Sequence, residues 1–198
     1  MELKDNKASV KLQALILIGG RSKRMGQDKS LLDYHGKPQW QYLVTLLEKH
    51  VEKVYISIRD KKQDIKYPDT ITDEIAGLGP FGAILTALKM YPDKAFLVLA
   101  TDLPFVDEKL IEKLVSSRDS RKNATALQGI TKDYPEPLLC IWEPAAFPTL
   151  QKFFKKEIYK PIQVLKDMPI HTIYVDNHFL QNINTIEEYH RIKEELRD

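Results

Sequence analysis

Two short runs made only of apolar residues limit most strongly what this chain can fold into. They are ALILI at residues 14–18 and FLVLA at residues 96–100. A continuous apolar run of this length is typical of a strand that is buried on both faces, as happens when helices cover a sheet on either side. We therefore predict that both runs are inner strands of a mostly parallel sheet.

Helix-like segments alternate with strand-like segments along the rest of the chain. Apolar residues recur at helical spacing in 38–49, Pro80 suits the first turn of a helix, and Asp107 suits an N-cap. The segment Thr185–Glu188 has the capping-box pattern that opens a last helix. Further strands are expected at 54–58, 137–142 and 172–175. This alternation predicts an α/β fold with helices on both faces of the sheet, and ligands in such folds bind beyond the carboxyl ends of the strands.

Length and composition narrow the class of protein. The 198 residues fit a polar N-terminal tail at 1–12 followed by a single domain at 13–198. A net charge of +2 is too small to indicate a nucleic-acid partner, and no apolar run approaches the roughly 20 residues that span a bilayer. The only cysteine, Cys140, lies in an apolar run and is expected to be a core residue, and the five histidines show no metal-ligand spacing. We expect a cytoplasmic protein that binds neither nucleic acid nor membrane.

The first apolar run leads directly into a loop of glycines and basic residues, within LILIGGRSKRMGQDKSLL at 15–32. The backbone amides of Gly19 and Gly20 can approach phosphate oxygens, and Arg24 and Lys29 can add charge-assisted contacts. The spacing fits neither the P-loop nor the G-x-G-x-x-G dinucleotide fingerprint. A solvated turn with surface cations is the alternative that these residues alone leave open.

This loop resembles the nucleotide-binding signature of the molybdenum cofactor guanylyltransferase family, whose pattern is L-A-G-G-x-S-x-R-M-G-x-D-K-x-L. The matching positions are Gly19, Gly20, Ser22, Arg24, Met25, Gly26, Asp28, Lys29 and Leu31. Ile18 stands where the family usually has alanine. The resemblance implies a Rossmann-like three-layer nucleotidyltransferase fold that uses Mg²⁺.

Two later segments support the same resemblance. TDEIAGLGPFGAI at 72–84 resembles the segment that carries an aspartate near the guanine and ribose, here Asp73, and a glycine turn at Gly79. In FLVLATDLPF, an apolar strand delivers Asp102 at its carboxyl end, which is how α/β folds place a metal ligand. A loop carboxylate at Asp73 and a turn cap at Asp102 remain the structural alternatives.

The acceptor side is indicated by two further segments. YPEPLLCIW at 134–142 resembles the segment where related enzymes present the acceptor site, which makes Pro137 a candidate substrate contact. NINTIEEY at 182–189 resembles the family's N-I-N-T-P-E-D and adds Asn182 and Asn184, with Ile186 in place of the usual proline. A purely structural role explains each of these residues about as well.

Taken together, the resemblance implies transfer of GMP from GTP to Mo-molybdopterin, giving molybdopterin guanine dinucleotide and pyrophosphate. Arg24, Lys29 and Asp102 are the expected catalytic residues, and Asp102 is the expected metal ligand. The expected nucleotide-binding residues are Leu17, Ile18, Gly19, Gly20, Arg24, Lys29, Asp73, Gly79 and Asp102. Molybdoenzymes or other cofactor-synthesis proteins are expected as transient partners. A nucleotidyltransferase for CTP or sugar phosphates and a non-catalytic nucleotide- or pterin-binding module are the alternatives.

Overall fold

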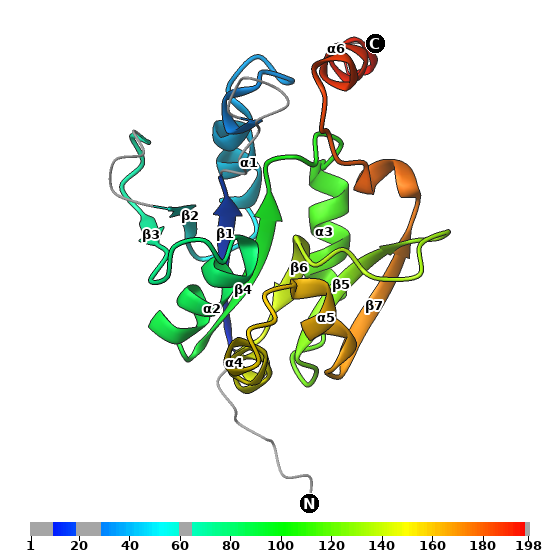
Figure 1. Cartoon of the computed structure of the whole chain (residues 1–198). Helices are drawn as coiled ribbons and strands as arrows, with labels where there is room; N and C mark the ends of the chain where they lie inside the picture. The colour runs from blue at the N-terminus through cyan, green and yellow to red at the C-terminus, as the bar shows by residue number, and fades with distance from the viewer. Residues whose placement is uncertain (1–9, 19–28, 60–64, 197–198) are drawn as a thin grey trace, which may run out of the picture.

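The computed structural model describes residues 10–18, 29–59 and 65–196, and these residues form a seven-stranded sheet in the order β3-β2-β1-β4-β6-β5-β7 (Figure 1). The strands are β1 (Lys11–Leu17), β2 (Val54–Ile58), β3 (Thr70–Thr72), β4 (Lys94–Ala100), β5 (Ala124–Gly129), β6 (Leu139–Trp142) and β7 (Ile170–Val175). Apart from β6, which is antiparallel to β4 and β5, neighbouring strands pair in parallel. The mostly parallel sheet predicted from the sequence is confirmed.

Helices cover both faces of this sheet and create the three layers. They are α1 (Gln39–Leu47), α2 (Pro80–Met90), α3 (Glu108–Ser116), α4 (Phe147–Lys155), α5 (Pro161–Lys166) and α6 (Ile186–Glu195). One core lies between the sheet and α1 and α3, and a second lies between the sheet and α2, α4 and α5. Helix α6 lies beyond the edge at which β1 and β4 end (Figure 1), where it packs on Leu32, Tyr34 and Ile183.

The predicted helix starts are formed by the side chains that the sequence indicated. The Asp107 carboxylate accepts a hydrogen bond from the backbone N–H of Leu110 at 2.8 Å. Thr185 and Glu188 make both reciprocal bonds of a capping box at the start of α6. Pro80 occupies the first turn of α2, where its missing N–H leaves no partner unsatisfied. Within the described part of the chain, no helix is long and apolar enough to cross a membrane.

Several expected boundaries differ from the structure, and two of them have a clear physical cause. Strand β1 begins at Lys11, inside the expected tail, because Lys11 and Leu12 extend the pairing with β4 and the Leu12 side chain is buried. Strand β6 begins at Leu139, two residues later than expected, and the carbonyl of Pro137 instead accepts a hydrogen bond from the Trp142 indole at 3.2 Å. Proline lacks the N–H that a strand pairing needs, which explains the later start.

Candidate active site

The carboxyl ends of β3 and β4 each deliver an aspartate to the same edge of the sheet. Asp73 directly follows β3, and its backbone N–H donates to the carbonyl of Ile58 at 3.0 Å. Asp102 is the second residue of the turn that follows β4, directly after Thr101. Thr101 holds this turn against β1 through hydrogen bonds of its N–H and hydroxyl to the carbonyl of Leu17. The fold therefore places both predicted carboxylates where open α/β sheets bind ligands.

Asp102 is held by residues that lie far from it in the sequence. The side-chain amide of Asn182 donates to Asp102 Oδ2 at 3.3 Å, and the Lys29 ammonium lies 3.9 Å from the same oxygen. The backbone N–H of Ile183 donates to the Asp102 carbonyl at 3.0 Å. The Lys29 and Asp102 side chains are only 15% and 25% exposed, so water screens this pair less than it screens a surface ion pair.

Lys29 is fixed by the same C-terminal segment. Its ammonium donates to Asn184 Oδ1 at 3.2 Å and to the carbonyl of Ile183. The structure thus brings Lys29, Asp102, Asn182 and Asn184 together. Their roles in binding and catalysis stay predictions.

The second carboxylate oxygen of Asp102, Oδ1, makes this cluster suitable for binding a metal ion. Asp102 Oδ1 is buried, and in the described ranges 10–18, 29–59 and 65–196 no hydrogen-bond partner reaches it. A buried carboxylate oxygen without a partner is costly unless a cation or donor joins it. Mg²⁺ prefers oxygen ligands and is often held by one or two carboxylates. The residues present at Asp102 therefore fit a divalent cation.

Asp73 lies in a different electrostatic setting. The Ser57 hydroxyl donates to Asp73 Oδ1 at 3.0 Å. Burial raises the pKa of the Asp73 carboxyl above its usual value, and the Ser57 hydrogen bond and the charge of Arg59 only partly oppose this. Gly79, predicted nearby, has a positive φ of 58° at the N-cap of α2, a backbone conformation that glycine adopts without strain.

The other predicted residues either lie outside the described part of the chain or have packing and backbone contacts. Gly19, Gly20 and Arg24 lie outside the described residues. The side chain of Ile18 is 3% exposed and belongs to the core under α1 and α3, so it packs in the interior. Pro137 contacts Trp142 through its carbonyl and has a structural role at least.

Glu136 is a further carboxyl at this edge that the sequence analysis did not select. Its Oε1 accepts the backbone N–H of Leu138 at 3.0 Å, and its own N–H donates to the carbonyl of Leu127 at 2.7 Å. Burial raises the pKa of Glu136, and the negative charge of Asp102 adds to the effect. The signal that identifies Glu136 is the pairing of β6 with β4, which is not visible in the local sequence.

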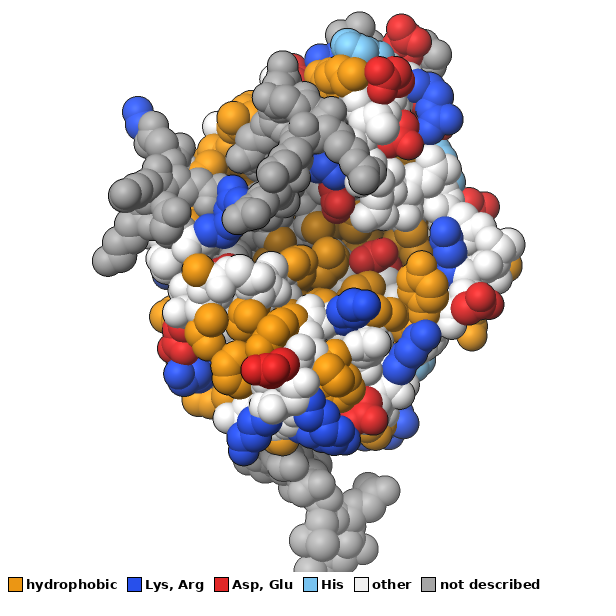
Figure 2. Space-filling model, in the orientation of Figure 1, with side chains coloured by type: hydrophobic (Ala, Val, Ile, Leu, Met, Phe, Trp, Pro, Cys, Tyr) orange, Lys and Arg blue, Asp and Glu red, His pale blue; other side chains and the backbone are white. Residues whose placement is uncertain are grey.

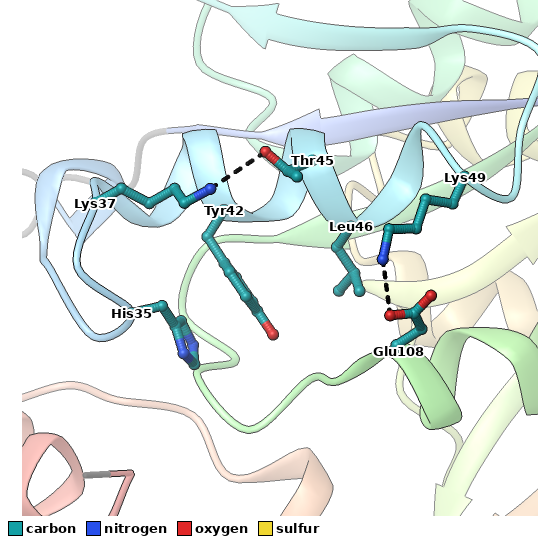
Figure 3. Close-up of a pocket in the computed structure, with 7 residues that line it drawn as sticks. All are labelled: His35, Lys37, Tyr42, Thr45, Leu46, Lys49 and Glu108. Atoms are coloured by element: carbon teal, nitrogen blue, oxygen red, sulfur yellow. Dashed lines mark hydrogen bonds and ion pairs between the residues drawn. The ribbon is translucent and has the colours of Figure 1, made fainter.

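A separate hollow of about 270 Å³ lies between α1 and the start of α3 (Figure 3). The Lys49–Glu108 ion pair at 2.8 Å spans one end, and His35 stacks on Tyr42 with the ring centres 3.7 Å apart. None of the predicted site residues that the structure describes lines it. Nearby, ligand atoms of His50, Glu108 and Glu112 lie within 4.8 Å of one another, a grouping that the histidine spacing did not reveal, but Lys49 already pairs with Glu108.

Comparison with known proteins identifies the family of this chain. The family model for the MobA-like NTP transferase domain matches residues 14–169. A Synechocystis molybdenum cofactor biosynthesis bifunctional protein is 34% identical over 91% of this chain, and the chain spans 53% of that protein, about half its length. A Methanothermobacter thermautotrophicus probable molybdenum cofactor guanylyltransferase is 32% identical over 71% of this chain and 76% of that protein.

A solved structure extends the likeness to three dimensions. The crystal structure of molybdopterin-guanine dinucleotide biosynthesis protein A from Archaeoglobus fulgidus superimposes with a TM-score of 0.76 at 26% identity, covering 93% of this chain and 98% of that one. The family model runs from within β1 to beyond β6, and the site aspartates lie inside it. The chain therefore belongs to the MobA-like NTP transferase family, which it shares with the molybdenum cofactor guanylyltransferases, and it is a nucleotidyltransferase.

Proposed function

We propose that this chain transfers GMP from GTP to Mo-molybdopterin, giving molybdopterin guanine dinucleotide and pyrophosphate. The observation that carries the proposal is the cluster of Lys29, Asp102, Asn182 and Asn184 at the carboxyl edge of the sheet. The names of the Methanothermobacter and Archaeoglobus relatives support the choice of substrates. Cytoplasmic action, and delivery of the product to a molybdoenzyme or another cofactor-synthesis protein, belong to this proposal.

The chemistry needs no nucleophile from the protein. A phosphate oxygen of the acceptor attacks the α-phosphorus of GTP, a new P–O bond forms, and the bond from that phosphorus to the bridging oxygen breaks as pyrophosphate leaves. Such reactions depend on positioning and on stabilisation of negative charge. Lys29, fixed by Asn184 and Ile183, supplies a positive charge for the leaving pyrophosphate. Gly19, Gly20 and Arg24 complete the proposed phosphate site.

Nucleotidyltransferases generally use a divalent metal, and we propose that Asp102 holds Mg²⁺ here through its buried oxygen. When bound, the ion withdraws electron density from the phosphate oxygens as a Lewis acid. The Asn182 amide, which donates to Asp102 Oδ2, orients the carboxylate and leaves Oδ1 to the ion.

The base would lie near Asp73. Guanine offers an N1–H and an exocyclic amine as donors, and a carboxylate is an acceptor-only group that matches them. The Ser57 hydroxyl already bonds Oδ1 of Asp73, which leaves Oδ2 toward the base. Asp73 thus selects guanine in this proposal, with Leu17, Ile18 and Gly79 contributing backbone around the nucleotide.

Pyrophosphate release with each of GTP, CTP, ATP and UTP, with and without molybdopterin, tests the proposal. We expect release with GTP only, and only when Mg²⁺ and molybdopterin are both present. Faster release with CTP would contradict the choice of nucleotide. Nucleotide binding without any release in the presence of molybdopterin would indicate a binding module instead.

A further inference from the structure

The pairing of β4 with β6 places Glu136 beside Asp102. Phe96 pairs with Trp142 and Leu99 with Leu139, in antiparallel register. The N–H of Ala100 donates to the carbonyl of Leu138 at 3.0 Å, so the pairing continues beyond the last strand pair. Counted onward in the same register, Glu136 corresponds to Asp102, and the negative charge of Asp102 acts on the Glu136 carboxyl.

Both carboxyls also continue the alternation of one side of the sheet. Side chains alternate along a strand, and counted in steps of two, Asp102 follows Phe96 and Val98 while Glu136 precedes Cys140. These three residues belong to the core under α2, α4 and α5. Figure 2 shows that this side of the molecule is hollowed, with many hydrophobic side chains on its floor and charged side chains among them. A flat ring can therefore lie against the sheet here.

The order of the strands in the sheet indicates which of the two substrates binds near Glu136. Asp73 follows β3 and Asp102 follows β4, three strands further along the sheet, or about 14 Å at a strand spacing of about 4.8 Å. A nucleoside with its phosphates spans that interval, with the base at Asp73. Glu136 precedes β6, one strand beyond Asp102. The group bound beyond the phosphates on this side is the acceptor.

The Glu136 carboxyl is held ready for a ligand. Its Oε1 accepts the Leu138 N–H at 3.0 Å, which fixes the side chain. Within residues 10–18, 29–59 and 65–196, Oε2 makes no hydrogen bond. A partly buried acid beside another acid is electrostatically unfavourable, and such groups are typical of functional sites.

We propose that Glu136 is an acceptor-binding residue whose Oε2 accepts hydrogen bonds from the N–H groups of the pterin. This inference rests on the proposed function. A reduced pterin carries ring N–H donors and an exocyclic amine, and a carboxylate can only accept. A charge-assisted bond in a partly buried site contributes both affinity and selectivity. Glu136 holds the ring while the acceptor phosphate reaches the α-phosphorus near Asp102.

The variant Glu136→Gln tests this inference. Its amide oxygen can keep the Leu138 N–H bond, so the loop should fold, while the amide NH₂ replaces Oε2 and opposes the donors of the pterin. We expect the KM for molybdopterin to rise about tenfold or more. The KM for GTP should change less than about twofold, because the nucleotide binds on the other side of Asp102. Glu136→Asp keeps the charge but withdraws it by one methylene, and we expect a smaller rise in the same KM.

The control is Asp133→Asn, which removes one negative charge from an exposed position in the same loop. It should leave both KM values unchanged.

Mn²⁺ binding to the GTP complex, followed by electron paramagnetic resonance, should be the same in wild type and Glu136→Gln. Weaker Mn²⁺ binding, equal rises in both KM values, or an unchanged KM for molybdopterin would each overturn the inference. A wild-type chain that gives no product with molybdopterin would instead overturn the proposed function, and the inference with it.

Discussion

The two aspartates of the candidate site are held in contrasting ways. Asp73 is held by the neighbouring strand β2: the Ser57 hydroxyl donates to its carboxylate, and its own backbone N–H donates to the carbonyl of Ile58. Asp102 is held by Lys29, Asn182 and Ile183, which come from distant parts of the chain. The Asp73 carboxylate is contacted by a neutral hydroxyl, that of Ser57. The Asp102 carboxylate is contacted by the charged Lys29 ammonium and the Asn182 amide.

This difference separates two tasks of one site. The end at Asp102 has to organise a highly charged group, and it is assembled only when the short helical turn at Lys29–Leu31, the turn after β4 and the segment before α6 come together. The end at Asp73 has to recognise neutral N–H donors, and two adjacent strands are enough to build it. Changes at Asp102 should therefore abolish the reaction, whereas changes at Asp73 should alter the choice of base.

The largest effect is expected from Asp102→Asn. The amide keeps the size of the side chain but removes the charge that would hold a divalent cation, and kcat should fall about 10³-fold. Pyrophosphate release measures the effect, and thermal melting checks that the variant folds. Asp133→Asn, an exposed acid outside the site, is the matched control and should keep full activity. A loss smaller than about tenfold would mean that Asp102 is not the metal ligand.

Lys29→Met should have the next largest effect. Methionine keeps much of the apolar stem but loses the ammonium that contacts Asp102, Asn184 and Ile183, and we expect about a 10²-fold loss of kcat. Lys37→Met is the control, since that ammonium lies 3.5 Å from Thr45 on α1, in the separate hollow of Figure 3. Its activity should stay within about twofold of wild type. An unaltered rate in Lys29→Met would remove Lys29 from the mechanism.

The sequence predicts the parts of this fold whose signals are local. Apolar runs predict β1 and β4, and a β-rich run predicts β2 with the bounds that the structure has. Helix caps are predictable for the same reason, because Asp107 and Thr185 act on N–H groups three residues away. Strands β3 and β5 escape prediction. β3 has three residues, and the small and polar residues of β5 become buried only through pairing with β6 and β7.

The site shows the same limit. A resemblance in short motifs indicates Lys29, Asp102, Asn182 and Asn184, but nothing local says that the Lys29 ammonium is fixed by a segment 154 residues further on. The segment at 134–142 is indicated by its motif, but nothing in that motif selects Glu136 within it. Its place beside Asp102 follows from the register of two antiparallel strands, which is set by the assembled sheet.

The smallest effects on the rate, and the sharpest test of the contrast, are expected from Asp73→Asn. The amide can keep the Ser57 bond, so the fold should be unaffected. An asparagine presents both a donor and an acceptor, so the preference for GTP over ATP and CTP should weaken about tenfold in kcat/KM while kcat changes little. Competition between nucleotides in the pyrophosphate assay measures the preference. A loss of kcat as large as that of Asp102→Asn would contradict the assignment of base recognition to Asp73 and of metal binding to Asp102.

The same variant gives a pH test of how Asp73 is buried. Because burial raises the pKa of Asp73 above 3.8, the folded chain binds this proton more tightly than the unfolded chain does. The ionised carboxylate therefore lowers the stability of the ligand-free protein above the raised pKa, and this penalty disappears as the pH falls below 3.8. Asp73→Asn should melt higher than wild type at pH 7, by on the order of 2 °C, and the gain should shrink as the pH falls toward that value. Ser57→Ala removes the hydrogen bond that opposes the shift, so it should melt lower than wild type at pH 7 and approach it in acid. If the difference in melting temperature between Asp73→Asn and wild type stays constant across this pH range, the Asp73 charge is solvated. Recognition of the base would then have to come from the backbone around Gly79.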